Sequence, residues 1–135
     1  MNKARQSLLV FLMIFHCSCN SQGTKKEKTK PDYLYKITSV SQWESSKGKD
    51  VLELTPADSD FIHLATKEQV FEVVKKFFAD QDEYVLLKLD TDKLPGDLVY
   101  EKNPGGKIKY YHLYNGEIPM DAVVEHKRVK QENLL

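Results

Sequence analysis

Cysteine is scarce in this sequence, since only Cys17 and Cys19 occur among its 135 residues. Both lie near the N-terminus, so the rest of the chain has neither an internal disulfide nor a cysteine metal site. With about 100 residues left after the N-terminal region, the chain has room for one modest core. We therefore expect a single domain that is held together by packing.

An excess of charge of either sign is also absent, because Lys and Arg together number 20, and Asp and Glu together number 20. Removal of residues 1–19 would take away Lys3 and Arg5 and no acidic residue, which leaves 18 basic and 20 acidic side chains. This balance gives no positive surface for a nucleic-acid backbone. We expect no nucleic-acid partner.

A run of apolar residues long enough to cross a membrane is missing as well. The longest run, residues 8–15, has the length of a signal-peptide core and follows Lys3 and Arg5. It leads to Ser18 and Cys19, a junction that resembles a bacterial lipoprotein processing site. Residues 1–19 are thus predicted to be a lipoprotein signal peptide. The alternatives are a secretory leader that is cleaved elsewhere and a retained anchor.

If Cys19 carries lipid, the protein is expected to be attached to a membrane. Acyl chains such as palmitate on this cysteine would hold the exported domain at a membrane of the bacterial cell envelope. Residues 20–32 contain no large apolar side chain and are predicted to form a disordered tether. The membrane is therefore the first expected partner.

The rest of the chain alternates strand-like and turn-like segments. The capping-box pattern of Thr66 and Gln69 opens a helix over about 66–79, whose apolar stripe includes Val70, Val74 and Phe77. Ser41 is predicted to cap a short helical turn that carries Trp43. Strands are expected over residues 33–38, 61–64, 84–89, 98–101, 108–114 and 122–129, with a weaker apolar segment at 51–54. A helical turn at Met120 is the alternative for the start of the last segment. One principal helix among short strands indicates an α+β fold with a small mixed or antiparallel split sheet.

Familiar catalytic motifs are absent: there is no glycine-rich phosphate loop, zincin helix, EF-hand loop or serine elbow. What remains is two histidines inside segments that should be buried, His63 in FIHLAT and His112 in YYHLYN. Each is either a structural histidine that bonds a neighbouring backbone group or a site residue. Glu101 is the most plausible acid or base nearby. His63, His112 and His126 lack short-range ligand spacing, so no metal site is predicted.

The order of several short blocks resembles the family known as domain of unknown function 952. The blocks are YLYKIT, FIHLAT, YVLLKLD, LVYE and YYHLYNGEIPMDAVV, and they span residues 33–129. Residues 130–135 are then a C-terminal tail. The chain departs from the family pattern at Asp60, where a glycine is common, and at Tyr111, where a proline often stands.

This resemblance implies a fold similar to the ADP-ribosyltransferase superfamily, and NAD is a candidate cofactor through it alone. If the protein is an enzyme, the expected activity is an ADP-ribosyl or phosphoryl transfer, with His63 and Glu101 as catalytic residues. Lys36 would neutralise a phosphate, and aromatic side chains would stack on a ring. The predicted ligand-binding residues are Lys36, Trp43, His63, Thr66, His112 and Tyr114.

Two classes of function follow. The first is a monomeric, lipid-anchored envelope protein whose cleft binds a small ligand, either nucleotide-like or ADP-ribose-like, with or without transferase activity. The second is an envelope module that binds another protein and has no enzymatic activity. An exported domain works outside the compartment that maintains NAD, which reduces the weight of NAD as the ligand.

Overall fold

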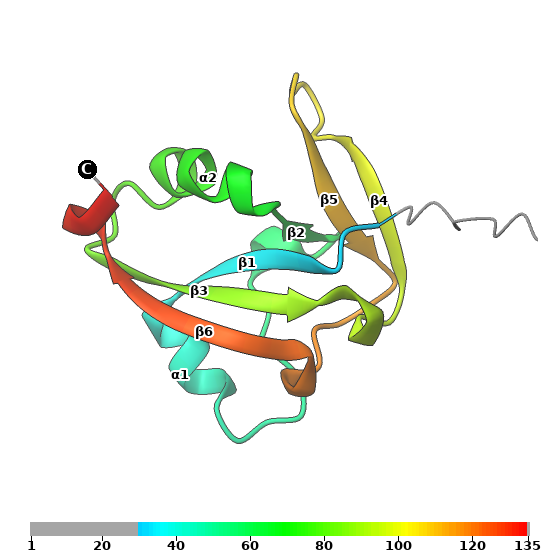
Figure 1. Cartoon of the computed structure of the whole chain (residues 1–135), viewed down its shortest axis with the longest axis horizontal. Coiled ribbons are helices and arrows are strands. Elements are labelled where there is room, and N and C mark those ends of the chain that lie inside the picture. Colours follow the sequence, from blue (N-terminus) through cyan, green and yellow to red (C-terminus); the bar gives the residue numbers. More distant parts are fainter. Residues whose placement is uncertain (1–29, 135) are drawn as a thin grey trace, which may run out of the picture.

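Two three-stranded antiparallel sheets form the framework of the protein (Figure 1). The computed structural model describes residues 30–134, so the predicted signal peptide, Cys19 and most of the predicted tether lie outside the described residues. The order of strands is β1-β3-β6 in the first sheet and β2-β5-β4 in the second. This arrangement confirms the α+β class and makes both sheets antiparallel.

The first sheet has its most apolar strand at its centre. β3 (Glu83–Asp90) pairs with β1 (Tyr33–Ser39) on one side and with β6 (Val123–Lys130) on the other. One face of β3 packs Val85, Leu87 and Leu89 into the main core. The other face packs Tyr84 against the second helix. A largely apolar segment such as YVLLKL suits a strand that is covered on both faces.

The second sheet is built around β5 (Lys109–Tyr114), which lies between β2 (Ile62–Leu64) and β4 (Asp97–Lys102). The predicted turn at residues 103–106 joins β4 to β5, and the backbone N–H of Gly106 donates to the carbonyl of Asn103 at 2.8 Å. Ile62 and Leu113 from this sheet are buried in the main core. The opposite face of the sheet therefore remains for polar side chains.

Two α-helices cover the first sheet from opposite sides (Figure 1). α1 (Val40–Ser46) begins after Ser39, whose hydroxyl accepts from the backbone N–H of Gln42, so the cap predicted at Ser41 was wrong by two residues. α2 (Val70–Phe77) follows a 3-10 turn over Lys67–Gln69, and the predicted capping box at its start is present. Only Val74 of α2 is fully buried, whereas the side chain of Phe77 is 53% exposed.

The ends of the domain differ from the predicted boundaries. Lys30 and Pro31 were assigned to the tether, but both bond to Thr91. The Lys30 ammonium donates to the Thr91 carbonyl. The Thr91 hydroxyl donates to the Pro31 carbonyl. Lys130, which was assigned to the tail, belongs to β6. The described domain therefore includes these residues, because each of them bonds to another part of it.

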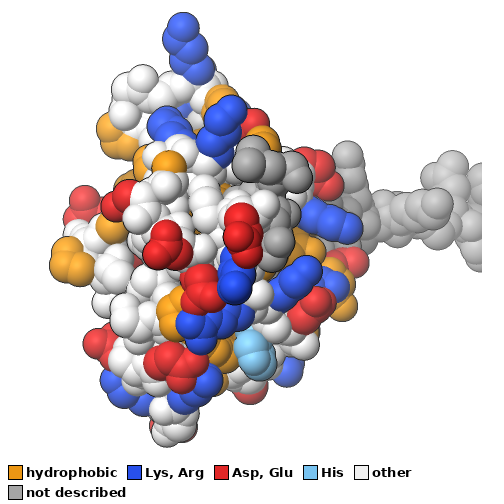
Figure 2. All heavy atoms as spheres, turned by 90° about the vertical axis from the view of Figure 1, so that its left-hand side faces the viewer, with side chains coloured by type: hydrophobic (Ala, Val, Ile, Leu, Met, Phe, Trp, Pro, Cys, Tyr) orange, Lys and Arg blue, Asp and Glu red, His pale blue; other side chains and the backbone are white. Residues whose placement is uncertain are grey.

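Two further segments have their outcome here. In the weak apolar segment at residues 51–54, Val51 makes an isolated bridge with Pro119. A 3-10 turn over Met120–Ala122 precedes β6, as in the alternative of a helical turn at Met120. No helix among the described residues is long and apolar enough to cross a membrane. Figure 2 shows basic and acidic side chains interspersed on one face, in line with the balanced composition.

Candidate functional site

A cleft of about 480 Å³ opens between β1, α2 and the segment that leads into β2. Its lining combines apolar side chains, several of them from α2 and the residue after it, with amides, hydroxyls and a buried ion pair. The lining residues that the argument uses are Lys36, Asp58, His63, Phe77, Phe78 and Tyr110.

The ion pair joins Lys36 of β1 to Asp58 of a 3-10 turn. The Lys36 ammonium lies 2.7 and 2.8 Å from the two carboxylate oxygens of Asp58, and both side chains are buried. Burial lowers the pKa of Lys36, and the charge of Asp58 opposes that effect. Burial alone would raise the pKa of Asp58, but hydrogen bonds from His63 and the charge of Lys36 outweigh it and lower that pKa. Asp58 is therefore ionised at neutral pH.

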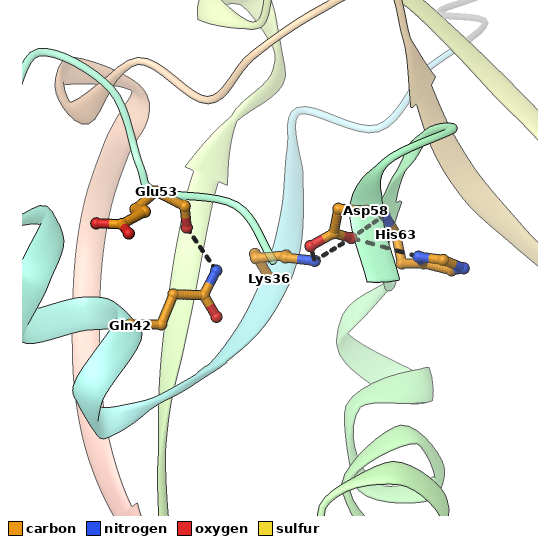
Figure 3. A network of polar contacts seen from close by, with 5 residues as sticks. All are labelled: Lys36, Gln42, Glu53, Asp58 and His63. Atoms are coloured by element: carbon orange, nitrogen blue, oxygen red, sulfur yellow. Dashed lines mark hydrogen bonds and ion pairs between the residues drawn. The ribbon is translucent and has the colours of Figure 1, made fainter. Parts of the chain in front are cut away.

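His63 continues this polar chain toward the second sheet. Its Nδ1 lies 3.3 Å from Oδ1 of Asp58, and its backbone N–H donates to the same oxygen at 3.2 Å. Figure 3 shows Asp58 between Lys36 and the His63 ring, which extends away from the ion pair. The side chain of His63 is 44% exposed. Asp58 thus holds the imidazole by one nitrogen and leaves the rest of the ring accessible.

A second polar group lies on the outer face of the second sheet. Oε1 of Glu101 accepts a hydrogen bond from the Tyr114 hydroxyl and lies 3.0 Å from Nδ1 of His112. These hydrogen bonds, the one from Tyr114 above all, lower the pKa of Glu101, and the same bond to Glu101 raises the pKa of Tyr114. The carboxylate is therefore well suited to hold the His112 ring in one orientation.

The two groups meet where β2 pairs with β5. His63 and His112 are directly opposite each other in the register, and their ring centres are 5.4 Å apart. The ring of Phe61 stacks on that of His112 at 4.1 Å and also contacts the His63 and Tyr114 rings. Because residues paired in this way project to the same face of a sheet, the register places both histidines together.

The structure places the predicted site residues in a cleft set, a set beside the cleft, and two positions elsewhere. Lys36 and His63 line the cleft, whereas Glu101, His112 and Tyr114 form the group beside it and are not among the lining residues. Trp43 lies in the main core, and its ring is 4.8 Å from that of His126. Thr66 stands at the start of the 3-10 turn before α2.

Asp58 is the main residue that sequence reasoning missed as a site residue. It was interpreted only as part of a turn with Ser59 and Asp60, which is the usual role of such residues. The signal for its second role is the lysine at an inward position of β1, because a buried ammonium needs an acidic partner. Phe61 was also missed, since its neighbours in FIHLAT predict an ordinary core residue.

The fold and the site define a small α+β domain that has a cleft of ligand size and a histidine pair beside it. The profile of the family described as "Protein of unknown function (DUF952)" matches residues 37–126, two thirds of the chain. The chain therefore belongs to this family, which confirms the family prediction. No curated protein sequence gives a significant match.

Solved structures agree with this assignment. The chain is similar to the crystal structure of protein CC0527 from Caulobacter crescentus, with 30% identity and a TM-score of 0.62 over 76% of this chain and 97% of that one. The solution structure of the same protein gives 31% identity and a TM-score of 0.63, over 74% and 86% of the two chains. The match thus extends over almost the whole of the CC0527 chain in its crystal structure.

Proposed function

We propose that this protein binds a small, uncharged, ring-containing molecule in the cleft between β1 and α2. The observation that carries the proposal is the cleft itself, whose volume of about 480 Å³ lies within the usual range for ligand pockets, roughly 300–1,000 Å³. It combines apolar walls with a few convergent polar groups, which is the usual composition of such sites.

The charge of the lining favours an uncharged ligand. Lys36 and Asp58 are the charged side chains among the described residues that line the cleft, and they neutralise each other. Lys36 was expected to neutralise a phosphate, but its ammonium already contacts both oxygens of Asp58. A nucleotide, ADP-ribose or NAD would bring negative charge without a free cation to receive it. Nucleosides therefore fit this lining better than nucleotides.

The aromatic residues of the cleft favour a ring. Phe77 is one of the most exposed large apolar side chains in the described chain, and it faces the cleft together with Phe78 and Tyr110. Apolar surface in contact with water is unfavourable in free energy. A ligand that covers the ring removes this surface from water, which favours binding. His63, Ser39 and Gln42 line the same cleft and would bond the polar groups of the ligand.

The test is calorimetric titration of the domain from residue 30 to 135 with nucleosides and with the matching nucleotides. We expect the nucleosides to bind more tightly than the nucleotides, ADP-ribose or NAD. Phe77→Ala should weaken nucleoside binding at least tenfold. The matched control is Phe71→Ala, which removes another exposed phenylalanine of α2 that does not line the cleft. Equal effects of the two substitutions, or tighter binding of the nucleotides, would contradict the proposal.

We propose further that the domain is exported and is anchored to a membrane of the bacterial envelope by lipid on Cys19. The leader pattern of residues 1–19 supports this proposal. Metabolic labelling with a palmitate analogue tests it, with Cys19→Ser expected to abolish incorporation and Cys17→Ser to preserve it. Incorporation that survives Cys19→Ser would place the anchor elsewhere.

A relationship to the ADP-ribosyltransferase superfamily remains a prediction from resemblance, and so does a role as a protein-interaction module. Glu101, the base expected for a transfer reaction, does not line the cleft. Ligand binding needs only the residues that do line it, and for that reason we propose binding in preference to transfer.

A further inference from the structure

Two carboxylate–histidine pairs lie side by side on the outer face of the second sheet. In one pair, Asp58 Oδ1 is 3.3 Å from Nδ1 of His63, and in the other, Glu101 Oε1 is 3.0 Å from Nδ1 of His112. The two histidines are register partners on β2 and β5. The fold thus builds the same arrangement twice, at two directly opposed positions.

The carboxylates determine which nitrogen of each ring carries the proton. A carboxylate accepts hydrogen bonds, so in the neutral imidazole Nδ1 holds the hydrogen and Nε2 keeps a free lone pair. Nε2 of His112 is buried and has no hydrogen-bond partner among the described residues. A buried polar atom without a partner is rare in native proteins and indicates a missing partner. Because this nitrogen carries a lone pair, its partner is a hydrogen-bond donor or a metal ion.

We propose that Nε2 of His63 and Nε2 of His112 together bind a divalent transition-metal ion of the zinc class. Zinc–nitrogen bonds are about 2.0–2.1 Å long, and with tetrahedral angles two imidazoles on one ion have ring centres about 5 Å apart. The observed separation is 5.4 Å, with the ring planes at 73°. The two ring centres are therefore close to the spacing that a shared ion requires.

The surroundings of the rings fit a cation. Histidines that bind metals usually donate their other ring N–H to a carboxylate, which orients the ring and makes the free nitrogen more basic. Asp58 and Glu101 supply this interaction for the two rings, respectively. Phe61 covers His112 with an apolar ring, while the 44% exposure of His63 leaves a path for the ion to enter.

The ion would have two protein ligands. Within residues 30–134 no group of three or more histidine, cysteine, aspartate or glutamate side chains is placed to hold a metal. The remaining coordination positions would go to water or to a donor atom of the molecule in the cleft, because His63 lines that cleft. Zinc sites that contact a substrate usually have three protein ligands and one open position, so this site would have one protein ligand fewer.

The test is zinc titration of the domain from residue 30 to 135 after treatment with a chelator. This domain excludes His16, Cys17 and Cys19, which would bind zinc by themselves. We expect one Zn²⁺ per domain, with at least a tenfold loss of affinity in His63→Ala and in His112→Ala. The matched control is His126→Ala, which removes an exposed histidine beside Trp43 and should leave the affinity unchanged.

A further variant separates metal binding from a structural effect. Glu101→Gln should weaken zinc binding about 10- to 100-fold, the usual cost of losing the carboxylate behind a metal-binding histidine. Asp58→Asn does not serve this purpose, because it also leaves the buried Lys36 without its partner. Nitrogen NMR of the histidine rings should show the Nε2 signals of His63 and His112 shifting together as zinc is added. His63 is exposed, so His63→Ala keeps the test valid even if His112→Ala does not fold.

The absence of zinc binding by the unaltered domain overturns the proposal, as does undiminished binding by His63→Ala. A loss in His126→Ala equal to that in His63→Ala would also overturn it, because it would point to adventitious surface binding. The nucleoside titration depends on Phe77→Ala and Phe71→Ala and not on the histidine variants, so the metal site and the cleft are tested separately.

Discussion

The ammonium of Lys36 and the carboxylate of Asp58 form an ion pair in which the two side chains are only 8% and 3% exposed. A buried pair of this kind contributes little net stability, but removal of one partner leaves the other charge without compensation. Lys36 cannot be reached by a ligand as a free cation while Asp58 holds it. This relationship determines the electrostatic character of the cleft.

Lys36→Met is expected to destabilise the domain by about 3–5 kcal/mol, because it leaves the Asp58 carboxylate buried without its cation. The double variant Lys36→Met/Asp58→Leu should lose much less than the sum of the two single variants, since it removes both charges. Urea unfolding of the four proteins measures both effects. A single variant that stays within about 1 kcal/mol of the unaltered protein would show that the pair is not buried in solution.

The pH dependence of stability should reveal Asp58. Its pKa in the folded protein is below the ordinary value of about 3.9 for an unfolded chain. The resulting stabilisation is fully present above the unfolded pKa and is lost as the pH falls through the folded pKa. Between pH 5 and pH 2, at roughly one-unit steps, the stability should therefore fall more steeply in the unaltered protein than in Asp58→Asn. The exposed Asp80→Asn serves as the control, and a slope in Asp58→Asn equal to that of the unaltered protein would refute this assignment.

Gly96 and Gly48 offer a matched test of close packing near the second sheet. Both have positive φ, 99° and 78°, but an added Cβ on Gly96 would lie 2.4 Å from the carbonyl oxygen of Tyr114, whereas one on Gly48 meets nothing within 4 Å. Gly48→Ala should cost about 1–2 kcal/mol from backbone strain alone. Gly96→Ala should cost clearly more, because backbone must move. Thermal unfolding of both variants checks the order, and equal losses would mean that the loop at Gly96 adapts freely.

Phe61→Ala should uncover His112. The Phe61 ring stacks on the imidazole at 4.1 Å, and His112 is fully buried. Acylation of histidine by diethyl pyrocarbonate, followed by mass spectrometry, should be faster at His112 in this variant than in the unaltered protein. His126 lies on β6 in the other sheet. Its acylation rate should be the same in Phe61→Ala and in the unaltered protein. An unchanged rate at His112 would mean that other side chains also cover the ring.

Some features of the fold could be predicted because their causes are local. The capping box of Thr66 and Gln69 fixes the start of the helical segment through bonds between residues three positions apart. The glycine-rich turn after Asn103 joins two strands in the same way. The end of the helix was less predictable, since the helix expected over about 66–79 stops at Phe77. The exposed Phe77 also belonged to the predicted apolar stripe but lines the cleft instead.

The site depended on contacts between distant segments. Lys36, His63, Glu101, His112 and Tyr114 could be named from the sequence as polar residues inside strand-like blocks. Their division between a cleft and a neighbouring histidine pair could not, because it depends on which strands pair and in which register. Trp43 shows the same limit, since its type fits both a pocket wall and a core.

The sequence by itself determined the family, the α+β class, most of the strands and the start of the main helix, because short-range patterns of apolar residues, caps and turns specify them. Only the tertiary structure decided that Asp58 neutralises Lys36 and that His63 lies opposite His112. Burial and strand register create those relationships, and both arise only when distant segments pack together. The chemistry proposed for the cleft and for the histidine pair rests on them.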